Sequence, residues 1–499
     1  MIFTNISSIK TKDESAFFDE LISLFVRFVD LFKERNLVVD GAVEDEELIS
    51  ELKSIGVIKD DSELPLLKSH LKDDYPIFIE SVCCAINNRD SMGGMLDKLY
   101  NSKRRDFQTK DLKTDKPTLV DFFCGAGGLS LGFIQNGFRV VLANDIEDVC
   151  INTYKYNHPE ISSDRIIQGD IRGIVDRIED YVKEEVDVVV GGPPCQGFSE
   201  ANRQRLIDDP RNHLYKYYVK AISKLCPKVF LMENVKGMLK VANQVVEDFE
   251  SLQIEKGGKV YSYKVAYKIL NSKDFSVAQA RERLIYLGIR NDLKNTSPVN
   301  LFELIASSCL KNPEYALSEA LKEIKPLEAP RVKGVTEIDS DVTGKKIDYN
   351  DYHSNKYLDL INNGRRIPLV YNHKARFVSD LNYEIYRKLD QGEDSTVEKI
   401  ADIMPYAHRN HCFKDKYYKL VADKPCRTIT AHLKMDCHSH IHPYQVRSIT
   451  PREAARVQSF PDDYFFLGAY LKTYMQIGNA VPVVMARKIA KIIMEVLKK

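Results

Sequence analysis

Short apolar runs alternate with segments of helical periodicity through the middle of the chain. The first run, TLVDFF, leads into a glycine-rich turn, and the residues after that turn have helical spacing. Five runs of this kind occur, at residues 118–123, 139–145, 186–194, 228–235 and 283–289. Strand-like runs that alternate with helices are typical of βαβ units, so the pattern predicts an α/β domain with a mostly parallel sheet. Ligands of such sheets bind beyond the carboxyl ends of the strands.

The segments on either side of this domain have different patterns. Apolar residues recur at helical spacing between Phe17 and Leu31, which predicts an amphipathic helix in a helical N-terminal extension. A polar, charged stretch from Lys103 to Lys116 has the composition of a linker. The alternation of apolar runs and helical segments ends after residue 292, and apolar residues at helical spacing occur again from about Arg447. We therefore expect an extension at 1–110, the α/β domain at 117–295, a smaller irregular domain at 296–446 and a returning segment at 447–499.

Composition limits the class of protein. At about 150 residues per domain, 499 residues suggest two to four domains. The formal net charge of zero is evidence against a uniformly basic coat, although nucleic-acid binding needs only a local basic face. No apolar run approaches the roughly 18 residues that span a bilayer, and the N-terminus lacks a signal-peptide pattern. Ten irregularly spaced cysteines form no disulfide framework, which favours a reducing cytoplasm.

Glycines and acidic residues gather where the expected strands end. Gly125 and Gly127 follow the first strand and would let the backbone approach a ligand at a helix N-terminus. The turn departs from G-x-G-x-x-G, which disfavours a nicotinamide cofactor, and a tight turn without a ligand is the ordinary alternative. Asp121, Asp145 and Asp170 lie near successive strand ends, where Asp145 suits ribose hydroxyls and Asp170 an adenine amino group. Each can instead cap a helix, but together they predict a nucleoside site.

The segment VDVVVGGPPCQGFS carries the strongest chemical signal. Pro193 and Pro194 fix the backbone directly after a buried strand, so Cys195 is presented rigidly. Only the thiolate attacks well, and a helix N-terminus or nearby arginines would lower the thiol pKa from its usual value of roughly 8.5. The ordinary alternative for a cysteine is an inert buried thiol. We assign that state to Cys83, Cys84, Cys150, Cys226 and Cys309.

Two later segments supply groups that suit a cysteine nucleophile. Glu233 ends the strand after Cys195 and brings a carboxyl group to the same edge of the sheet. Arg281 and Arg283 are two residues apart, so they share one face of an extended chain. Two guanidinium groups suit a thiolate, a carboxylate or a base oxygen. Taken singly, Glu233 is equally an ion-pair partner, and the arginines are equally a solvated edge.

In this order the segments resemble the motifs of the cytosine-C5 DNA methyltransferases. The matching strings are DFFCGAGG (121–128), GGPPCQGFS (191–199), ENV (233–235), QARER (279–283), RSITPREAARVQSFPDDY (447–464) and QIGNAVP (476–482). The resemblance covers about 117–292 and 447–499. It implies a Rossmann-like catalytic domain and a target-recognition domain at 296–446. It also implies methyl transfer from S-adenosylmethionine to C5 of a flipped-out cytosine in a specific double-stranded DNA sequence, with S-adenosylhomocysteine as product.

The resemblance also implies residue roles. Cys195 is the nucleophile that bonds to C6, Glu233 contacts the ring nitrogen and exocyclic amine, and the two arginines bind the base oxygen and orient the carboxylate and thiolate. The implied S-adenosylmethionine contacts are Phe123, Gly125, Gly127, Asp145, Ile146, Asp170, Ile171, Pro194, Leu214, Asn479 and Val481. Ile146 replaces the aromatic that some members stack on adenine, which implies a weaker contact. Residues 199–214 match the loop that closes over DNA. The implied DNA contacts are Gln196, just before this loop, and Ser199, Arg203, Arg205 and Arg211 within it.

The recognition region is dense in potential metal ligands. They are His408, His411, Cys412, Cys426, His432, Cys437, His438, His440 and His442. His438 and His442 have H-x-x-x-H spacing, but no C-x-x-C pair accompanies them. We therefore expect no metal requirement, and histidines that contact DNA or the core.

The remaining expectations concern context. The resemblance favours a prokaryotic enzyme that acts as a monomer on double-stranded DNA, in the cytoplasm with the nucleoid, in a restriction-modification or epigenetic role. A cognate restriction endonuclease is a candidate partner. Two other readings stay open: a transfer-RNA cytosine-C5 methyltransferase, and a catalytically inactive DNA-binding accessory protein. The N-terminal extension would pack on the catalytic domain, add DNA contacts, or form a helix-turn-helix that regulates its own gene.

Overall fold

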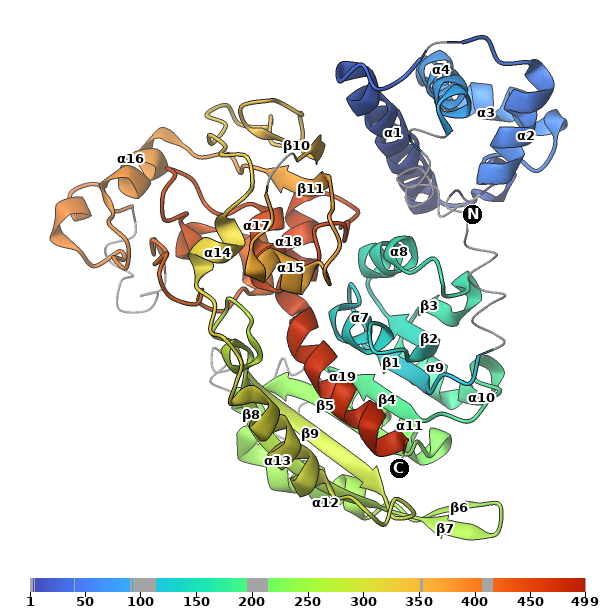
Figure 1. Ribbon diagram of the computed structural model, residues 1–499, viewed down its shortest axis with the longest axis vertical. Coiled ribbons are helices and arrows are strands. Elements are labelled where there is room, and N and C mark those ends of the chain that lie inside the picture. The colour runs from blue at the N-terminus through green and yellow to red at the C-terminus, as the bar shows by residue number, and fades with distance from the viewer. Residues whose placement is uncertain are drawn as a thin grey trace. The chain divides into compact units, whose positions relative to one another are not determined.

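The chain forms two compact units. The computed structural model describes residues 3, 5–39, 41–89, 92, 114–194, 214–350, 353–405 and 416–498. The smaller unit comprises Met1–Thr114 with Lys155–Ser162 and Ile347–Tyr349, and the larger unit comprises Asp115–Tyr154, Ser163–Lys346 and Asn350–Lys499 (Figure 1). No helix of the described residues is both long and apolar enough to cross a membrane.

The described elements of the smaller unit's N-terminal part are helical, as predicted. A capping box begins α1: the Thr11 hydroxyl accepts a hydrogen bond from Glu14 N (3.1 Å), and the Glu14 carboxylate accepts one from Thr11 N (3.0 Å). The apolar stripe of α1 is buried and packs on α4, where Phe25 meets Phe78 edge to face. The helices are α1 (Lys12–Glu34), α2 (Asp45–Ile55), α3 (Leu64–Leu71) and α4 (Asp74–Asn87), with 3-10 turns η1 (Ile6–Ser8) and η2 (Asp61–Glu63).

The larger unit is built on a seven-stranded sheet in the order β3-β2-β1-β4-β5-β9-β8. Neighbours from β3 to β5 pair in parallel, whereas β9 is antiparallel to both β5 and β8. The prediction of a mostly parallel sheet is therefore confirmed. The strands are β1 (Thr118–Phe122), β2 (Arg139–Asp145), β3 (Ile166–Gln168), β4 (Val188–Gly191), β5 (Val229–Val235), β8 (Tyr263–Asn271) and β9 (Glu282–Arg290). The β6 (Ile254–Lys256) and β7 (Lys259–Tyr261) strands form a separate hairpin, and β10 (Gly344–Tyr349) and β11 (Leu369–Lys374) a second two-stranded sheet.

Helices cover both faces of the large sheet. On one face, apolar side chains of β1, β4 and β5 pack with those of α9, α11 and α12 in a single core. On the other, α7 and α13 lie on the strands, and the C-terminal helix α19 packs against both of them (Figure 1). This is the Rossmann-like arrangement that the resemblance implies. The helices that follow the strands along the chain, together with the C-terminal helix, are α7 (Gly128–Ile134), α8 (Asp148–Asn157), α9 (Ile171–Asp176), α10 (Ile178–Tyr181), α11 (Leu214–Leu225), α12 (Ala242–Glu250), α13 (Pro298–Cys309) and α19 (Val483–Leu497).

Most of the expected recognition region consists of loops and short elements. Its first helix, α13, packs on β8 and β9 and so belongs to the layers of the sheet. A small core forms further on, where Ile385 and Tyr386 of α16 pack with Leu389, Ile400 and Tyr417. The remaining helices are α14 (Leu317–Leu321), α15 (Lys356–Ile361), α16 (Asp380–Lys388), α17 (Pro451–Val457) and α18 (Tyr470–Asn479). The 3-10 turns are η3 (Ser163–Arg165), η5 (Lys236–Val241), η6 (Ser272–Phe275), η7 (Glu398–Ile400), η9 (Ala431–Lys434) and η10 (His438–His440).

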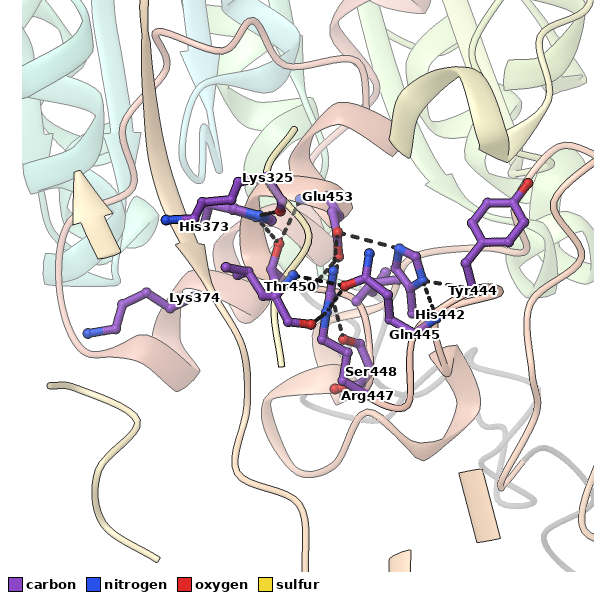
Figure 2. A network of polar contacts seen from close by, with 12 residues as sticks. Lys325, His373, Lys374, His442, Tyr444, Gln445, Arg447, Ser448, Thr450 and Glu453 are labelled. Atoms are coloured by element: carbon purple, nitrogen blue, oxygen red, sulfur yellow. Dashed lines mark hydrogen bonds and ion pairs between the residues drawn. The ribbon is translucent and has the colours of Figure 1, made fainter. Parts of the chain in front are cut away.

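A buried ion pair ties this region to the start of α17. Both Arg447 Nη atoms donate to the Glu453 carboxylate at 2.7 Å, and the two side chains are fully buried (Figure 2). Glu453 also accepts from Thr450 N (2.7 Å), which begins the helix, and Arg447 Nε donates to Leu327 O (3.2 Å). A buried charge is tolerated only when it is paired and hydrogen-bonded in this way. We call this set, with His373 and His442, the Arg447–Glu453 network.

Two buried histidines complete the network. His373 lies between Thr450 Oγ1 (3.0 Å) and Lys325 O (2.7 Å), and burial lowers its pKa to about 4. His442 Nδ1 accepts from Tyr444 N and Gln445 N, both at 3.1 Å, and burial lowers its pKa to about 3. Both rings are therefore neutral at pH 7. Three stretches of the recognition region thus converge on one helix N-terminus (Figure 2).

Candidate active site

The glycine-rich turn after β1 is shaped by left-handed backbone at alternate positions. Phe123, Gly125 and Gly127 have φ of 55°, 53° and 84°. A Cβ at Gly127 would lie 2.8 Å from Tyr464 Oη, and one at Gly128 would lie 2.6 Å from Val481 O. Glycine is therefore required for close approach as well as for backbone conformation. The two closing motifs pack directly on this turn, which the sequence order alone did not indicate.

Asp145 holds the turn from the neighbouring strand. Its carboxylate accepts hydrogen bonds from Gly125 N (2.8 Å) and Glu147 N (2.9 Å), and burial raises the pKa of this carboxyl group. The preceding residue, Asn144, donates to Ile167 O and Gly169 O at 3.0 Å and ties the end of β2 to β3. The ends of β1, β2 and β3 therefore meet in one place, as the strand-end prediction requires.

The other two acidic residues have different surroundings. Asp121 is buried at the end of β1, where burial, opposed by a hydrogen bond from Ser130, raises its pKa to about 7. It therefore lies beneath the turn and cannot meet a ligand at the surface. Asp170 caps α9 by accepting from Arg172 N (2.9 Å), and its ion pair with the Arg172 guanidinium lowers its pKa. Of the three, Asp145 is the one aligned with the turn.

The other residues expected to contact the cofactor differ in how far their side chains are exposed. Ile146, directly after Asp145, has a side chain 64% exposed, which is unusual for a large apolar residue at a strand end. Asn479 and Pro194 are exposed, whereas Ile171 and Val481 are buried. Phe123 and Leu214 are partly buried against the sheet core.

The Pro-Pro turn after β4 is anchored by the next strand. Asn234 Nδ2 donates to Pro193 O (3.0 Å), and a Cβ at Gly192 would lie 2.9 Å from Glu233 Oε2. The absence of a side chain at Gly192 thus leaves room for the Glu233 carboxylate beside the chain that leads to Cys195. Cys195 itself, with Gln196, Ser199, Arg203, Arg205 and Arg211, lies outside the described residues. Asn234 was not singled out in the sequence, although the motif ENV contains it.

Glu233 and Arg283 form an ion pair at this edge. Arg283 Nε lies 2.7 Å from Glu233 Oε1, and each side chain is 13% exposed. The pair follows from strand register, because β9 runs antiparallel to β5 with Arg283 opposite Val235. The arginine fixes one carboxylate oxygen, and Oε2 lies on the Gly192 side. A nearly buried carboxylate held in this way is suited to hydrogen bonding with a bound base.

Arg281 has different partners from Arg283. Its guanidinium is fully buried and donates to Ile429 O (2.6 Å) and Gly478 O (3.0 Å). Burial lowers its pKa, and the nearby Arg283 adds to this effect while Glu233 opposes it. The two arginines therefore lie in one electrostatic environment, but Arg281 binds backbone of the recognition region and of α18. The two guanidinium groups thus have different protein partners, although they lie two residues apart.

Two glutamines extend this buried connection. Gln279 accepts from Ile429 N (2.8 Å) and donates to Gln458 Oε1 (2.7 Å). Gln458 in turn donates to Ile477 O (2.7 Å) and Ala480 O (3.1 Å). Both glutamines are fully buried, so the first residue of QARER joins both closing motifs. Their place inside recognised motifs was the one signal in the sequence that pointed to them.

Several described histidines of the recognition region have protein partners. His438 stacks on Tyr417 with a centroid separation of 4.5 Å and hydrogen-bonds with Tyr386 Oη (2.7 Å). His440 is buried, and burial lowers its pKa to about 3. Among the described residues, no group of three or more His, Cys, Asp or Glu side chains is arranged to hold a metal ion. His408, His411 and Cys412 lie outside them.

Comparison with known proteins finds relatives over three quarters of the chain. The family model for C-5 cytosine-specific DNA methylase matches residues 118–495. The type II methyltransferase M.DdeI of Desulfomicrobium norvegicum is 32% identical over 393 residues, which cover 75% of this chain and 87% of that protein. M.FnuDI of Fusobacterium nucleatum is 32% identical over 382 residues, covering 76% and 94%. A solved structure of a putative DNA modification methyltransferase encoded within an E. coli prophage has a TM-score of 0.59 at 24% identity, covering 77% and 100%, and shares the fold.

Proposed function

The chain belongs to the C-5 cytosine-specific DNA methylase family, and from that premise we propose that it methylates a cytosine in a specific double-stranded DNA sequence with Cys195 as nucleophile. It is a DNA (cytosine-5-)-methyltransferase whose relatives are type II methyltransferases. The observation that carries the proposed roles is the Glu233–Arg283 pair, which lies against Gly192, three residues before Cys195.

The turn after β1 is the proposed site for S-adenosylmethionine, which supplies the transferable methyl group. Gly125 has open space where a Cβ would stand, which leaves the backbone there open to a ligand, and the Asp145 carboxylate is held at the adjacent strand end. An acidic group at this position suits ribose hydroxyls. The exposed side chain of Ile146 offers an apolar surface for adenine in place of an aromatic ring.

Replacing Asp145 by alanine is expected to weaken S-adenosylmethionine binding by about 10-fold or more, since both a ligand contact and the anchor of Gly125 are lost. Isothermal titration calorimetry with the full chain measures this change. Asp180→Ala, an exposed carboxylate on α10 of the same unit, is the control and should bind as the wild type does. Equal affinity in Asp145→Ala would rule out this site.

The proposed reaction uses the residues at the β4 and β5 strand ends. The Cys195 thiolate forms a bond to C6 of cytosine, and the C5–C6 π electrons move toward C5, which becomes nucleophilic. Glu233, fixed by Arg283, accepts a hydrogen bond from the exocyclic amine and shares a proton with the ring nitrogen N3, which takes up that proton as negative charge develops there. After C5 is methylated, loss of the C5 proton to a base breaks the S–C6 bond, which releases the thiolate and restores the aromatic ring.

The substrate must be extruded from the duplex for this geometry to be reached. Flipping a base costs roughly a few kcal/mol, which contacts of the recognition region and of residues 199–214 would offset. We propose a monomer that works with the nucleoid in the cytoplasm, with a cognate restriction endonuclease as partner. The names of the relatives, which are type II methyltransferases, support the restriction-modification context.

Expression in a host without cytosine methylation tests the function directly. Bisulfite sequencing of the host DNA is expected to show protected cytosines in one short sequence, and Cys195→Ser should abolish protection while retaining S-adenosylmethionine binding. Cys309→Ser, away from the strand ends on α13, is the matched control and should protect the same sites. Unprotected DNA with modified transfer RNA would contradict the DNA substrate, and full activity of Cys195→Ser would contradict the mechanism.

A further inference from the structure

The loop that follows α17 is held by strand β11 of the recognition region. Arg452, which is fully buried, donates from Nε to Tyr371 O of β11 (2.7 Å) and from Nη2 to Tyr464 O of the loop. The next residue of β11, Asn372, donates to Phe466 O (2.9 Å) and accepts from Phe466 N (3.0 Å). The backbone of this loop therefore has a fixed place beside β11.

The side chain of Tyr464 reaches from this loop to the glycine-rich turn after β1. Its hydroxyl donates a hydrogen bond to Ala126 O, in the middle of the turn. The residue is only 3% exposed, and its ring packs against Phe460 and Phe466, with centroid separations of 4.9 and 5.5 Å. A side chain this deeply buried offers little surface to a ligand, so its effect on ligand binding would act through the backbone of the turn.

Tyr464 anchors the turn at a point where the backbone has alternative conformations. Ala126 lies between Gly125 and Gly127, whose φ angles are 53° and 84°. Glycine populates positive and negative φ about equally, so a turn with two glycines changes conformation at little cost. Asp145 fixes the N–H of Gly125 (2.8 Å), and Tyr464 fixes the carbonyl of Ala126. Together the two anchors select one conformation of the turn.

We propose that Tyr464 is a positioning residue for cofactor binding, which holds the glycine-rich turn in the conformation that receives S-adenosylmethionine. The inference rests on the proposed function, since it requires the cofactor at this turn. Apparent affinity falls in proportion to the fraction of the protein whose turn has the competent conformation, so an anchor behind the turn raises affinity without touching the ligand. Because Arg452 joins the backbone of Tyr464 to Tyr371, the recognition region supplies the support for the cofactor turn.

Tyr464→Phe tests the proposal, because it removes the hydroxyl and keeps the ring. In the full-length protein, binding of S-adenosylmethionine should weaken by about 5- to 10-fold, since the Ala126 carbonyl loses its buried donor. Binding of S-adenosylhomocysteine should weaken by the same factor, because the population of the competent turn does not depend on which ligand follows. Isothermal titration calorimetry measures both affinities. In methyl transfer, KM for S-adenosylmethionine should rise while kcat at saturation stays near the wild-type value.

Tyr263→Phe is the matched control. Tyr263 is also 3% exposed, and its hydroxyl donates to Pro227 O (2.7 Å), just before the start of β5 and so at the opposite end of the sheet from the cofactor turn. Both variants lose one buried hydroxyl-to-carbonyl bond, so their urea midpoints should fall by similar amounts. Ligand affinity should fall in Tyr464→Phe alone. Without ligand, amide hydrogen exchange at residues 124–128 should also be faster in Tyr464→Phe alone.

The outcomes separate this inference from the function on which it rests. Equal ligand affinities and equal exchange at residues 124–128 in Tyr464→Phe and Tyr263→Phe would overturn it. A loss of affinity for S-adenosylmethionine without a matching loss for S-adenosylhomocysteine would also overturn it, because that result indicates a direct contact with one ligand. A wild-type protein that binds neither ligand would instead contradict the proposed cofactor site.

Discussion

Replacing Glu233 by glutamine is expected to lower kcat for methyl transfer by about 10²–10⁴-fold, the usual contribution of a positioned acid or base. Glutamine keeps the shape of the side chain but removes the carboxyl group that pairs with Arg283 and that shares a proton with the ring nitrogen of the activated cytosine. Binding of S-adenosylmethionine should be nearly unchanged, since the Asp145 site lies at other strand ends. Single-turnover transfer of a labelled methyl group to the mapped DNA site measures the effect.

The neighbouring carboxylate provides the control for this variant. Glu282 precedes Arg283 on β9 and forms an exposed ion pair with Lys236 at 2.9 Å. Glu282→Gln alters the charge of β9 without removing either partner of the Glu233–Arg283 pair, so kcat should remain near the wild-type value. A Glu233→Gln enzyme that turns over at the rate of Glu282→Gln would remove Glu233 from the mechanism. Circular dichroism confirms that both variants are folded, which matters because Glu233→Gln leaves Arg283 nearly buried and unpaired.

The second large effect concerns stability. Glu453→Gln should lower the free energy of unfolding by about 3–5 kcal/mol, because it leaves the Arg447 guanidinium charged and buried without a carboxylate. The same carboxylate accepts Thr450 N at the start of α17, so the variant also weakens the point at which the recognition region joins the catalytic unit. Urea unfolding followed by circular dichroism measures the change.

An exposed ion pair tests whether burial causes the large loss of stability expected for Glu453→Gln. Glu384 and Arg387 form an ion pair at 2.7 Å on α16, with side chains 45% and 58% exposed. Glu384→Gln should cost less than about 1 kcal/mol, the usual range for a surface pair. If Glu453→Gln is no more damaging than Glu384→Gln, the Arg447–Glu453 network does not hold the two parts together as we infer.

The strands that contain a continuous apolar run could be predicted from the sequence, whereas the strands without such a run could not. Runs such as TLVDFF and RVVLAND lie in the middle of the sheet, are buried on both faces and became β1 and β2. The edge strand β8 is mostly half-buried, and exposed Lys264 and Lys268 interrupt its apolar residues, so it shows no continuous apolar run. The other edge strand, β3, has three residues, which is too short for a periodicity to appear.

The sequence by itself determined which chemical groups this protein carries and at which strand ends they lie. The residues of each motif and the order of the motifs can be read from the sequence alone. The same holds for the glycine-rich turn and the Pro-Pro turn, each of which directly follows a buried strand. These were enough to indicate Glu233, Asp145 and the Cys195 segment, and the family that the comparisons then showed.

Only the tertiary structure decided which group meets which. Arg281 and Arg283 have the same spacing signal, yet Arg283 binds Glu233, 50 residues earlier, while Arg281 binds Ile429 O and Gly478 O, 148 and 197 residues later. Asn234, Gln279 and the Arg447–Glu453 network likewise depend on strand register and on segments that return from far along the chain. Partners at such separations leave no mark in local periodicity, because buried polar groups are matched in space after the layers have packed.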